Sequence, residues 1–158
     1  MGTTATVQIA ALQLQEAART HKIELSVYLV ASGEEIAAAI DNVQASGATA
    51  LNILWSPMFY INRHLIMDRV AAAHLPTIYD IPEVAEEGGF AAYGPRAWQL
   101  VREIMPQQIA KIFLGIKIAD IPVEQPTKFE LVINLKTAKA MGVTVPEALL
   151  ARADKVIE

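Results

Sequence analysis

Short apolar runs alternate with longer amphipathic segments along most of this chain, and no other feature constrains its fold as strongly. The pattern predicts strands at Ile23–Val30, Thr49–Trp55, Thr77–Asp80 and Phe90–Tyr93, with helices between them. The run Thr49–Trp55 is almost wholly apolar, as expected for a central parallel strand covered on both faces. We therefore predict an α/β fold, in which helices flank an open parallel sheet.

Start and stop signals place the helices. Ser32 and Glu35 have the spacing of a capping box, and Gly47 is a stop signal for the helix that follows. Pro106 lies inside a long helical pattern, which we expect it to kink or split. The predicted helices run from about residue 6 to 20, 35 to 46, 57 to 73 and 95 to 115.

The C-terminal region adds a strand with a different pattern. Phe129–Leu135 alternates apolar and other residues, which predicts a strand with one buried face. A short helix ending at Gly142 should follow. Thr144 and Glu147 again have capping-box spacing, with Pro146 in the first turn. The proline-containing stretch Asp120–Pro126 before the strand is either an extended linker or an ordinary loop.

Composition excludes several classes of protein. The chain has 158 residues, enough for one compact domain, and its 53% hydrophobic content contains no apolar run near the roughly 18–20 residues of a membrane helix. The absence of cysteine excludes disulfides and thiolate metal sites. The net charge is −4 and the cations are scattered, so no nucleic-acid partner is indicated. The apolar excess fits either an Ala-rich helical layer or a domain parted from its partner.

Enzyme signatures are absent from the sequence. It contains no G-x-S-x-G, P-loop, H-E-x-x-H or G-x-G-x-x-G motif, and its three histidines lack the spacing of metal ligands. A flavodoxin-like enzyme would need a phosphate-binding loop after the first strand, and Ala31-Ser-Gly-Glu34 is too acidic and too poor in glycine. We predict no catalysis, no cofactor and no metal.

The first candidate ligand site is the junction after the second predicted strand. Ligands of open α/β sheets bind beyond the carboxyl ends of the strands, against helix N-termini. Ser56 before Pro57 is a plausible N-cap, so nearby backbone amides could hold a carboxylate. Trp55, Met58, Phe59 and Tyr60 could form an apolar or stacking wall, or they could be core.

Two further junctions carry charged residues. Beyond Tyr79, Asp80 or Glu83 could accept hydrogen bonds from a ligand ammonium, or could cap the following short helix. Gly94 permits close approach of the backbone, and Arg96 could meet a ligand carboxylate, although we favour a structural role for it. The predicted ligand-binding residues are Trp55, Ser56, Pro57, Met58, Tyr79, Asp80 and Glu83.

Three stretches carry a resemblance to a known family. They are Leu75-Pro-Thr-Ile-Tyr79, Glu86-Glu-Gly-Gly-Phe-Ala-Ala-Tyr-Gly94 and the segment from Pro122 onwards, within a match that begins near Leu12. This sequence resembles the substrate-binding proteins of bacterial ABC transporters, most closely the group that takes up amino acids such as tryptophan and tyrosine. The resemblance implies one lobe of a type I periplasmic-binding-protein-like fold, with residues 1–119 as its C-terminal lobe.

In that family, residues 120–158 would form the linker, crossover strand and terminal helices that join the other lobe. The resemblance implies an amino-acid-like ligand held between two lobes, delivery to ABC permease subunits, and a periplasmic or extracellular, membrane-associated parent protein. Met1-Gly2-Thr3-Thr4 does not resemble a signal peptide, and we expect a shortened chain, with a natural short protein as the alternative.

A single lobe should have lost affinity and gained an exposed surface. One lobe supplies only part of the ligand contacts. The strand in Phe129–Leu135 would lack the sheet it normally joins, so we expect two copies to associate through this segment. Trp55 departs from the smaller or polar residues of the family, which leaves the ligand open. The competing function is a ligand-sensing lobe that regulates a signalling or transcription protein.

Overall fold

The computed structural model describes residues 3–158, which form two compact units divided after Ala31. Met1 and Gly2, on which the expectation of a shortened chain rests, lie outside the described residues. The first unit contains α1 (Thr3–Thr20) followed by an extended segment. The strand predicted at Ile23–Val30 is not formed: the segment has no strand pairing, and its apolar side chains are mostly exposed.

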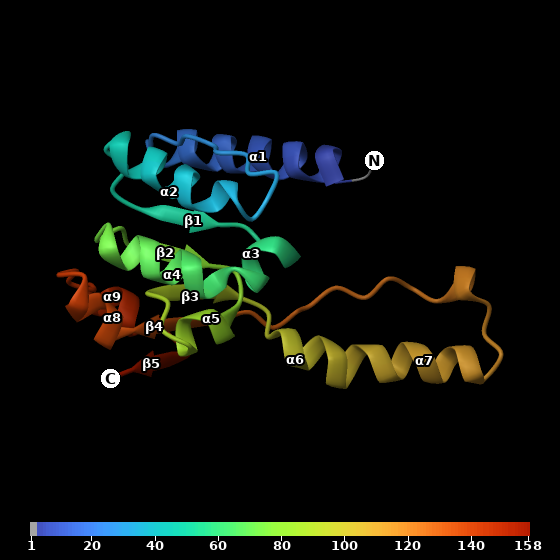
Figure 1. The fold of residues 1–158 in the computed structure, drawn as a ribbon. Helices are drawn as coiled ribbons and strands as arrows, with labels where there is room; N and C mark the ends of the chain where they lie inside the picture. Colours follow the sequence, from blue (N-terminus) through green and yellow to red (C-terminus); the bar gives the residue numbers. More distant parts are fainter. Residues whose placement is uncertain (1–2) are drawn as a thin grey trace. The chain divides into compact units, whose positions relative to one another are not determined.

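Five strands form one sheet in the second unit, in the order β1-β2-β3-β4-β5 (Figure 1). Strands β1, β2 and β3 are parallel, as the alternating pattern predicts, whereas β4 runs antiparallel to β3 and β5 runs parallel to β4. The sheet is therefore mostly parallel with one reversal. The strands are β1 (Leu51–Ile53), β2 (Thr77–Tyr79), β3 (Ala91–Gly94), β4 (Glu130–Asn134) and β5 (Lys155–Ile157).

Helices cover this sheet, and α2 packs against α4. Ile36, Ile40 and Val43 form the buried stripe of α2, which ends where Gly47 adopts a positive φ of 76°, as predicted. The capping box at Ser32 is not formed, because the helix begins at Glu35 with Glu34 as its N-cap. The first helices of the second unit are α2 (Glu35–Ala45), α3 (Pro57–Ile61), α4 (Arg63–Ala72) and α5 (Pro82–Glu86).

β4 lies inside the sheet, between β3 and β5, and differs from the sequence prediction in two ways. Val132 and Ile133 are both fully buried, so the strand is covered on both faces rather than on one. The strand pairs with β3 on one side and β5 on the other, so the expectation that it would lack a sheet is wrong. Exchange of this strand between copies would have to break both ladders. The sequence pattern also missed β5.

Two short helices follow β4. Asn134 caps α8 (Leu135–Ala140) by accepting the amide of Thr137, and Gly142 follows with the predicted positive φ. The side-chain amide of Asn134 also donates to the carbonyl of Ala85, which ties the end of β4 to α5. In α9 (Glu147–Leu150), Pro146 is the N-cap and no side chain caps the helix, so the second capping box is not formed either.

A helical arm separates β3 from β4. It comprises α6 (Ala97–Gln99), the π-helical η1 (Leu100–Ile104), α7 (Met105–Phe113) and the return segment 114–127, which includes the 3₁₀ turn η2 (Ile118–Asp120). The long helix is thus interrupted just before Pro106, as predicted. In Figure 1 the arm extends away from the sheet and then returns to it.

Candidate functional site

A small cavity lies where β1 and β2 end. Its volume is about 20 Å³, which is room for roughly one water molecule. Four of the seven predicted ligand residues line it: Trp55, Ser56, Tyr79 and Asp80. The other lining residues are Ile53, Leu54, Phe59, Tyr60, Arg63, Ile66, Ile81 and Val84.

Strand register brings these residues together. Ile53 pairs with Tyr79 across the parallel β1–β2 ladder, so the residues after them emerge at one edge of the sheet. The backbone N–H of Trp55 is near enough to the carboxyl of Asp80 to lower its pKa, so the two strand ends lie close together. The indole of Trp55 is 59% exposed, which leaves an aromatic face open to a ligand.

Ser56 begins α3, as its position before Pro57 predicts. Its backbone is extended, and its hydroxyl accepts the amide of Met58 at 3.3 Å. However, α3 has only five residues, and one of its free amides is already used by the cap. Neither Pro57 nor Met58 lines the cavity. The carboxylate site expected at this helix start therefore has little support in the geometry.

Asp80 carries the main electrostatic feature of the site. Partial burial raises the pKa of its carboxyl from 3.8 to about 6, and hydrogen bonds from the backbone N–H groups of Asp80 and Trp55 oppose this rise. No cation is paired with Asp80 in the part of the chain that the structure describes. A ligand ammonium placed there would stabilise the charged carboxylate.

Tyr79 lines the same cavity and is buried, with an exposed fraction of 5%. Burial raises the pKa of its phenol, and its hydroxyl has no hydrogen-bond partner among the described residues. A Cβ on Gly89 would lie 2.8 Å from the Tyr79 ring, so glycine leaves the room that the ring occupies. A buried hydroxyl without a partner is costly, which favours a bound water or ligand group here.

Glu83 lies on α5 and does not line the cavity. Both oxygens of its carboxylate are buried without a hydrogen-bond partner in the described part of the chain. Glu83 does not cap α5 either. The helix begins at Pro82 with Ile81 as its N-cap, and no side chain caps it.

Arg63 is a residue of the site that the sequence pattern did not single out. Its guanidinium stacks over the Tyr60 ring at 4.5 Å and donates from Nε to the Glu87 carboxylate at 2.6 Å. Tyr60 and Arg63 are three residues apart within the helix predicted from 57 to 73, and this spacing was the available signal, although the structure divides that helix into α3 and α4. The cation stiffens the aromatic wall, because it ties α4 to the end of α5.

Gly94 lets the end of β3 pack closely against the backbone of Asp80. A Cβ at this position would lie 1.8 Å from the carbonyl oxygen of Asp80, closer than any side chain permits. The close backbone approach predicted for Gly94 is therefore present, and it holds the end of β3 against the residue that carries the site's carboxylate.

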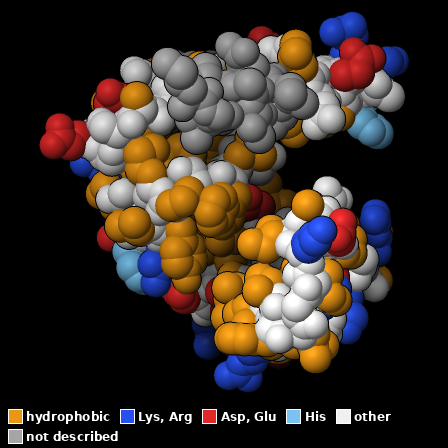
Figure 2. All heavy atoms as spheres, turned by 90° about the vertical axis from the view of Figure 1, so that its right-hand side faces the viewer, with side chains coloured by type: hydrophobic (Ala, Val, Ile, Leu, Met, Phe, Trp, Pro, Cys, Tyr) orange, Lys and Arg blue, Asp and Glu red, His pale blue; other side chains and the backbone are white. Residues whose placement is uncertain are grey.

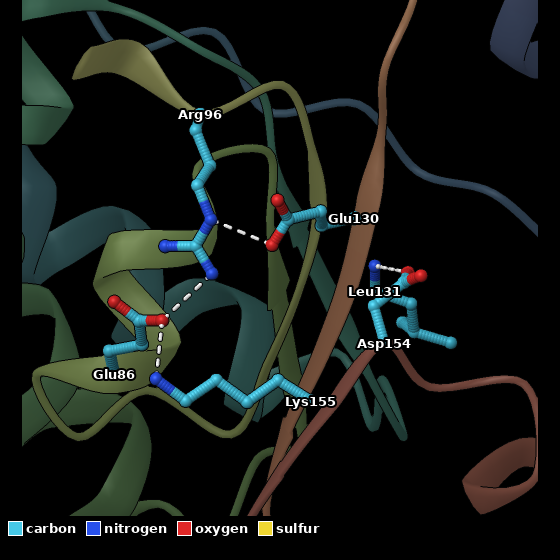
Figure 3. A network of polar contacts seen from close by, with 6 residues as sticks. All are labelled: Glu86, Arg96, Glu130, Leu131, Asp154 and Lys155. Carbon is cyan, nitrogen blue, oxygen red and sulfur yellow. Dashed lines mark hydrogen bonds and ion pairs between the residues drawn. The ribbon is translucent and has the colours of Figure 1, made fainter. Parts of the chain in front are cut away.

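Arg96 belongs to an ion-pair network at the root of the arm (Figure 3). Its Nη2 lies 2.9 Å from the Glu86 carboxylate, and its Nε lies 2.7 Å from the Glu130 carboxylate. Lys155 contacts the same Glu86 oxygen at 2.9 Å. These partners occupy the guanidinium, so Arg96 has the structural role that we favoured over ligand binding.

A larger cavity of about 420 Å³ lies at the root of the arm, and the sequence pattern gave no sign of it. The cavity lies between the outgoing helix and the return segment and is lined by Pro95, Arg96, Gln99, Glu103, Ile104, Gln107 and residues 124–128.

Within the described residues, no cluster of three His, Asp or Glu side chains could hold a metal, and no helix is both long and apolar enough to cross a membrane.

Comparison with known proteins gives one family and several solved structures. Residues 3–157 match the family model described as ABC transporter substrate binding protein. No curated protein matches the chain. A conserved domain protein from Vibrio cholerae O1 biovar El Tor superposes with a TM-score of 0.86 at 22% identity, over 96% of this chain and 50% of that one.

Two other solved structures are similar over nearly the whole chain. An ABC domain from Streptococcus pneumoniae in complex with L-Trp has a TM-score of 0.82 at 24% identity, over 94% of this chain and 50% of that chain. The ligand-free, open form of a substrate-binding protein with adhesive properties from Clostridium difficile has a TM-score of 0.63 at 18% identity, over 98% and 50%. The chain thus spans about half the length of each of these proteins.

Proposed function

Because the chain belongs to the ABC transporter substrate-binding protein family, we propose that it supplies one half of a solute-binding site that serves an ABC importer. The observation that carries this proposal is the gathering of Trp55, Ser56, Tyr79 and Asp80 at the ends of two adjacent parallel strands. That edge is where open α/β sheets bind their ligands.

The proposed ligand is an amino acid with an apolar or aromatic side chain. Asp80 accepts the ligand ammonium, and the exposed face of Trp55 stacks on the side chain. Tyr79, whose buried hydroxyl has no partner among the described residues, lines the same cavity. The Streptococcus pneumoniae structure, which contains L-Trp, supports an aromatic amino acid as the first one to test.

The rest of the site would come from the other half of a protein as long as the solved relatives. We keep the predicted division into residues 1–119 and 120–158 as a proposal about such a protein, with ABC permease subunits as its partners. The family is typically periplasmic or extracellular, and we propose the same for the parent of this chain. In this function the chain binds and releases its ligand without catalysis.

Native mass spectrometry of the gently purified chain tests this function, with release and identification of anything bound. An adduct with the mass of an amino acid, lost in the variant Asp80→Asn and retained in Asp68→Asn on the exposed side of α4, is the expected result. An adduct that survives Asp80→Asn would contradict the assigned site. Adducts of another chemical class would contradict the proposed ligand.

A further inference from the structure

Among the described residues that line the cavity at the ends of β1 and β2, Arg63 is the one cation, and its guanidinium already has acceptors. It donates to the Glu87 carboxylate from Nε at 2.6 Å and from Nη2 at 3.4 Å. Its Nη1 donates to the carbonyl of Tyr60 at 3.1 Å. A ligand carboxylate would therefore have to displace Glu87 before it could pair with Arg63.

The backbone amides at the strand ends also have acceptors. The N–H groups of Trp55 and Asp80 lie close to the carboxyl of Asp80. The hydroxyl of Ser56 accepts the amide of Met58. The helices that follow the two strands, α3 and α5, have five residues each and both begin with proline, which has no N–H to offer. The donors that could hold a ligand carboxylate at this edge are thus already used.

The carboxyl groups at this edge, by contrast, lack cationic partners. Asp80 has none in the part of the chain that the structure describes, and three residues further on both carboxylate oxygens of Glu83 are buried without a hydrogen-bond partner there. Tyr79 has a buried hydroxyl without a partner, but the cavity that it lines holds about 20 Å³, which is too small for a carboxylate group. The local charge therefore favours a cation and disfavours an anion.

Exposed aromatic surface lies next to Asp80. The Trp55 side chain is 59% exposed and the Tyr60 side chain 38% exposed, and both line the same cavity as Asp80. Figure 2 views the end of the molecule towards which α3 projects and shows hydrophobic side chains gathered there. An aromatic ligand side chain can stack on this surface while its ammonium meets the carboxylate.

We propose that this chain recognises the ammonium and the aromatic side chain of its ligand but not the ligand carboxylate, so that it binds arylethylamines at least as tightly as aromatic amino acids. This inference rests on the proposed function, because it assigns parts of the same ligand to the same site. A ligand carboxylate close to Asp80 repels it, so its removal should strengthen binding. The carboxylate is left to the rest of the site.

Three indole compounds separate the two charges of the ligand. L-Tryptophan has an ammonium and a carboxylate, tryptamine only the ammonium, and indole-3-propionate only the carboxylate. Each is titrated into the ¹⁵N-labelled chain at pH 7.5, where the carboxyl of Asp80, whose pKa burial raises to about 6, is mostly charged. Tryptamine should shift the amide signals of Trp55, Ser56, Tyr79 and Asp80 with a Kd about threefold or more below that of L-tryptophan. Indole-3-propionate should leave these signals unchanged up to about 10 mM.

Asp80→Asn tests whether the carboxylate sets this preference. The variant should bind tryptamine at least about tenfold more weakly, because the charge-assisted contact is lost. Asp68→Asn on the exposed side of α4 is the matched control and should keep both the affinity and the order of the three compounds. The Nε–H signal of Arg63 should not move with indole-3-propionate, because Glu87 holds the guanidinium.

The outcomes separate this inference from the proposed function. Shifts at the site with L-tryptophan but not with tryptamine would overturn the inference and leave the proposed function standing. Binding of indole-3-propionate as tight as that of tryptamine, or movement of the Arg63 Nε–H signal, would do the same. No shift with either L-tryptophan or tryptamine would overturn both.

Discussion

Asp80 is the residue whose surroundings most directly link stability to binding. Its pKa in the folded protein is raised to about 6, so the folded state holds its proton more tightly than the unfolded chain does. The free energy of unfolding should therefore fall as pH rises between about 4 and 6, and remain lower above that window. The carboxylate costs stability at neutral pH, and a bound ammonium would offset this cost.

Replacing Asp80 by Asn should stabilise the unliganded chain by about 1–3 kcal/mol at pH 7.5 and flatten its stability profile between pH 4 and 6. Urea unfolding at a series of pH values measures both effects. Asp68→Asn on the exposed side of α4 is the control and should change stability by less than about 0.5 kcal/mol. A loss of stability in Asp80→Asn at pH 7.5 would show that the carboxylate stabilises the fold.

Gly94 allows a second prediction at the same scale. In Gly94→Ala the new methyl group collides with the carbonyl of Asp80, so β3 must shift, at a cost of about 2 kcal/mol or more. Gly33→Ala is the matched control, because its nearest neighbour is the side-chain amide of Asn62, 3.1 Å away, which can move. Thermal unfolding of both variants measures the difference, and equal melting temperatures would refute the close approach.

At the scale of elements, the Arg96 network ties both ends of the arm to the sheet. Arg96 lies on the outgoing side, Glu130 on the returning side, and Glu86 on α5 (Figure 3). Hydrogen bonds from Arg96, followed by Lys155, lower the pKa of Glu86. Its contribution to stability is therefore present above its ordinary pKa and lost as pH falls through the lowered value.

Arg96→Met should cost about 1–3 kcal/mol at pH 7, because two partly buried carboxylates lose their main partner. The loss should shrink in acid, as pH falls through the lowered pKa of Glu86 and its carboxylate becomes protonated. Arg69→Met removes a far more exposed pair with Asp41 and should cost at most about 1 kcal/mol. Chemical denaturation at pH 7 and pH 3 tests this, and an equal loss for the two variants would contradict the structural role of Arg96.

Sequence pattern predicted elements well where local signals and packing agree. The stop signals at Gly47 and Gly142 and the split before Pro106 are present in the fold. The capping boxes at Ser32 and Thr144 failed, because each helix begins later than its signal. The segment Ile23–Val30 has strand composition but no strand beside it, and composition alone cannot supply a pairing partner.

For the whole molecule, the α/β class and the mostly parallel sheet followed from the alternation of patterns. The place of β4 did not, because its apolar alternation could not reveal that a second strand would cover its other edge. The rule about strand ends grouped Trp55, Ser56, Tyr79 and Asp80, which line one cavity, and their ligand role stays a prediction. The rule could not show that Glu83 lies outside this cavity, because its direction depends on how α5 packs, and it did not find Arg63.

The central claim is that the ends of β1 and β2 bind an amino acid, even in a chain half the length of its solved relatives. Titration of the ¹⁵N-labelled chain with L-tryptophan, followed by NMR, tests it most directly, since shifts report even millimolar binding. We predict saturable shifts at Trp55, Ser56, Tyr79 and Asp80 that disappear in Asp80→Asn. No shift at these residues up to about 10 mM ligand, or shifts confined to the cavity at the root of the arm, would contradict the claim.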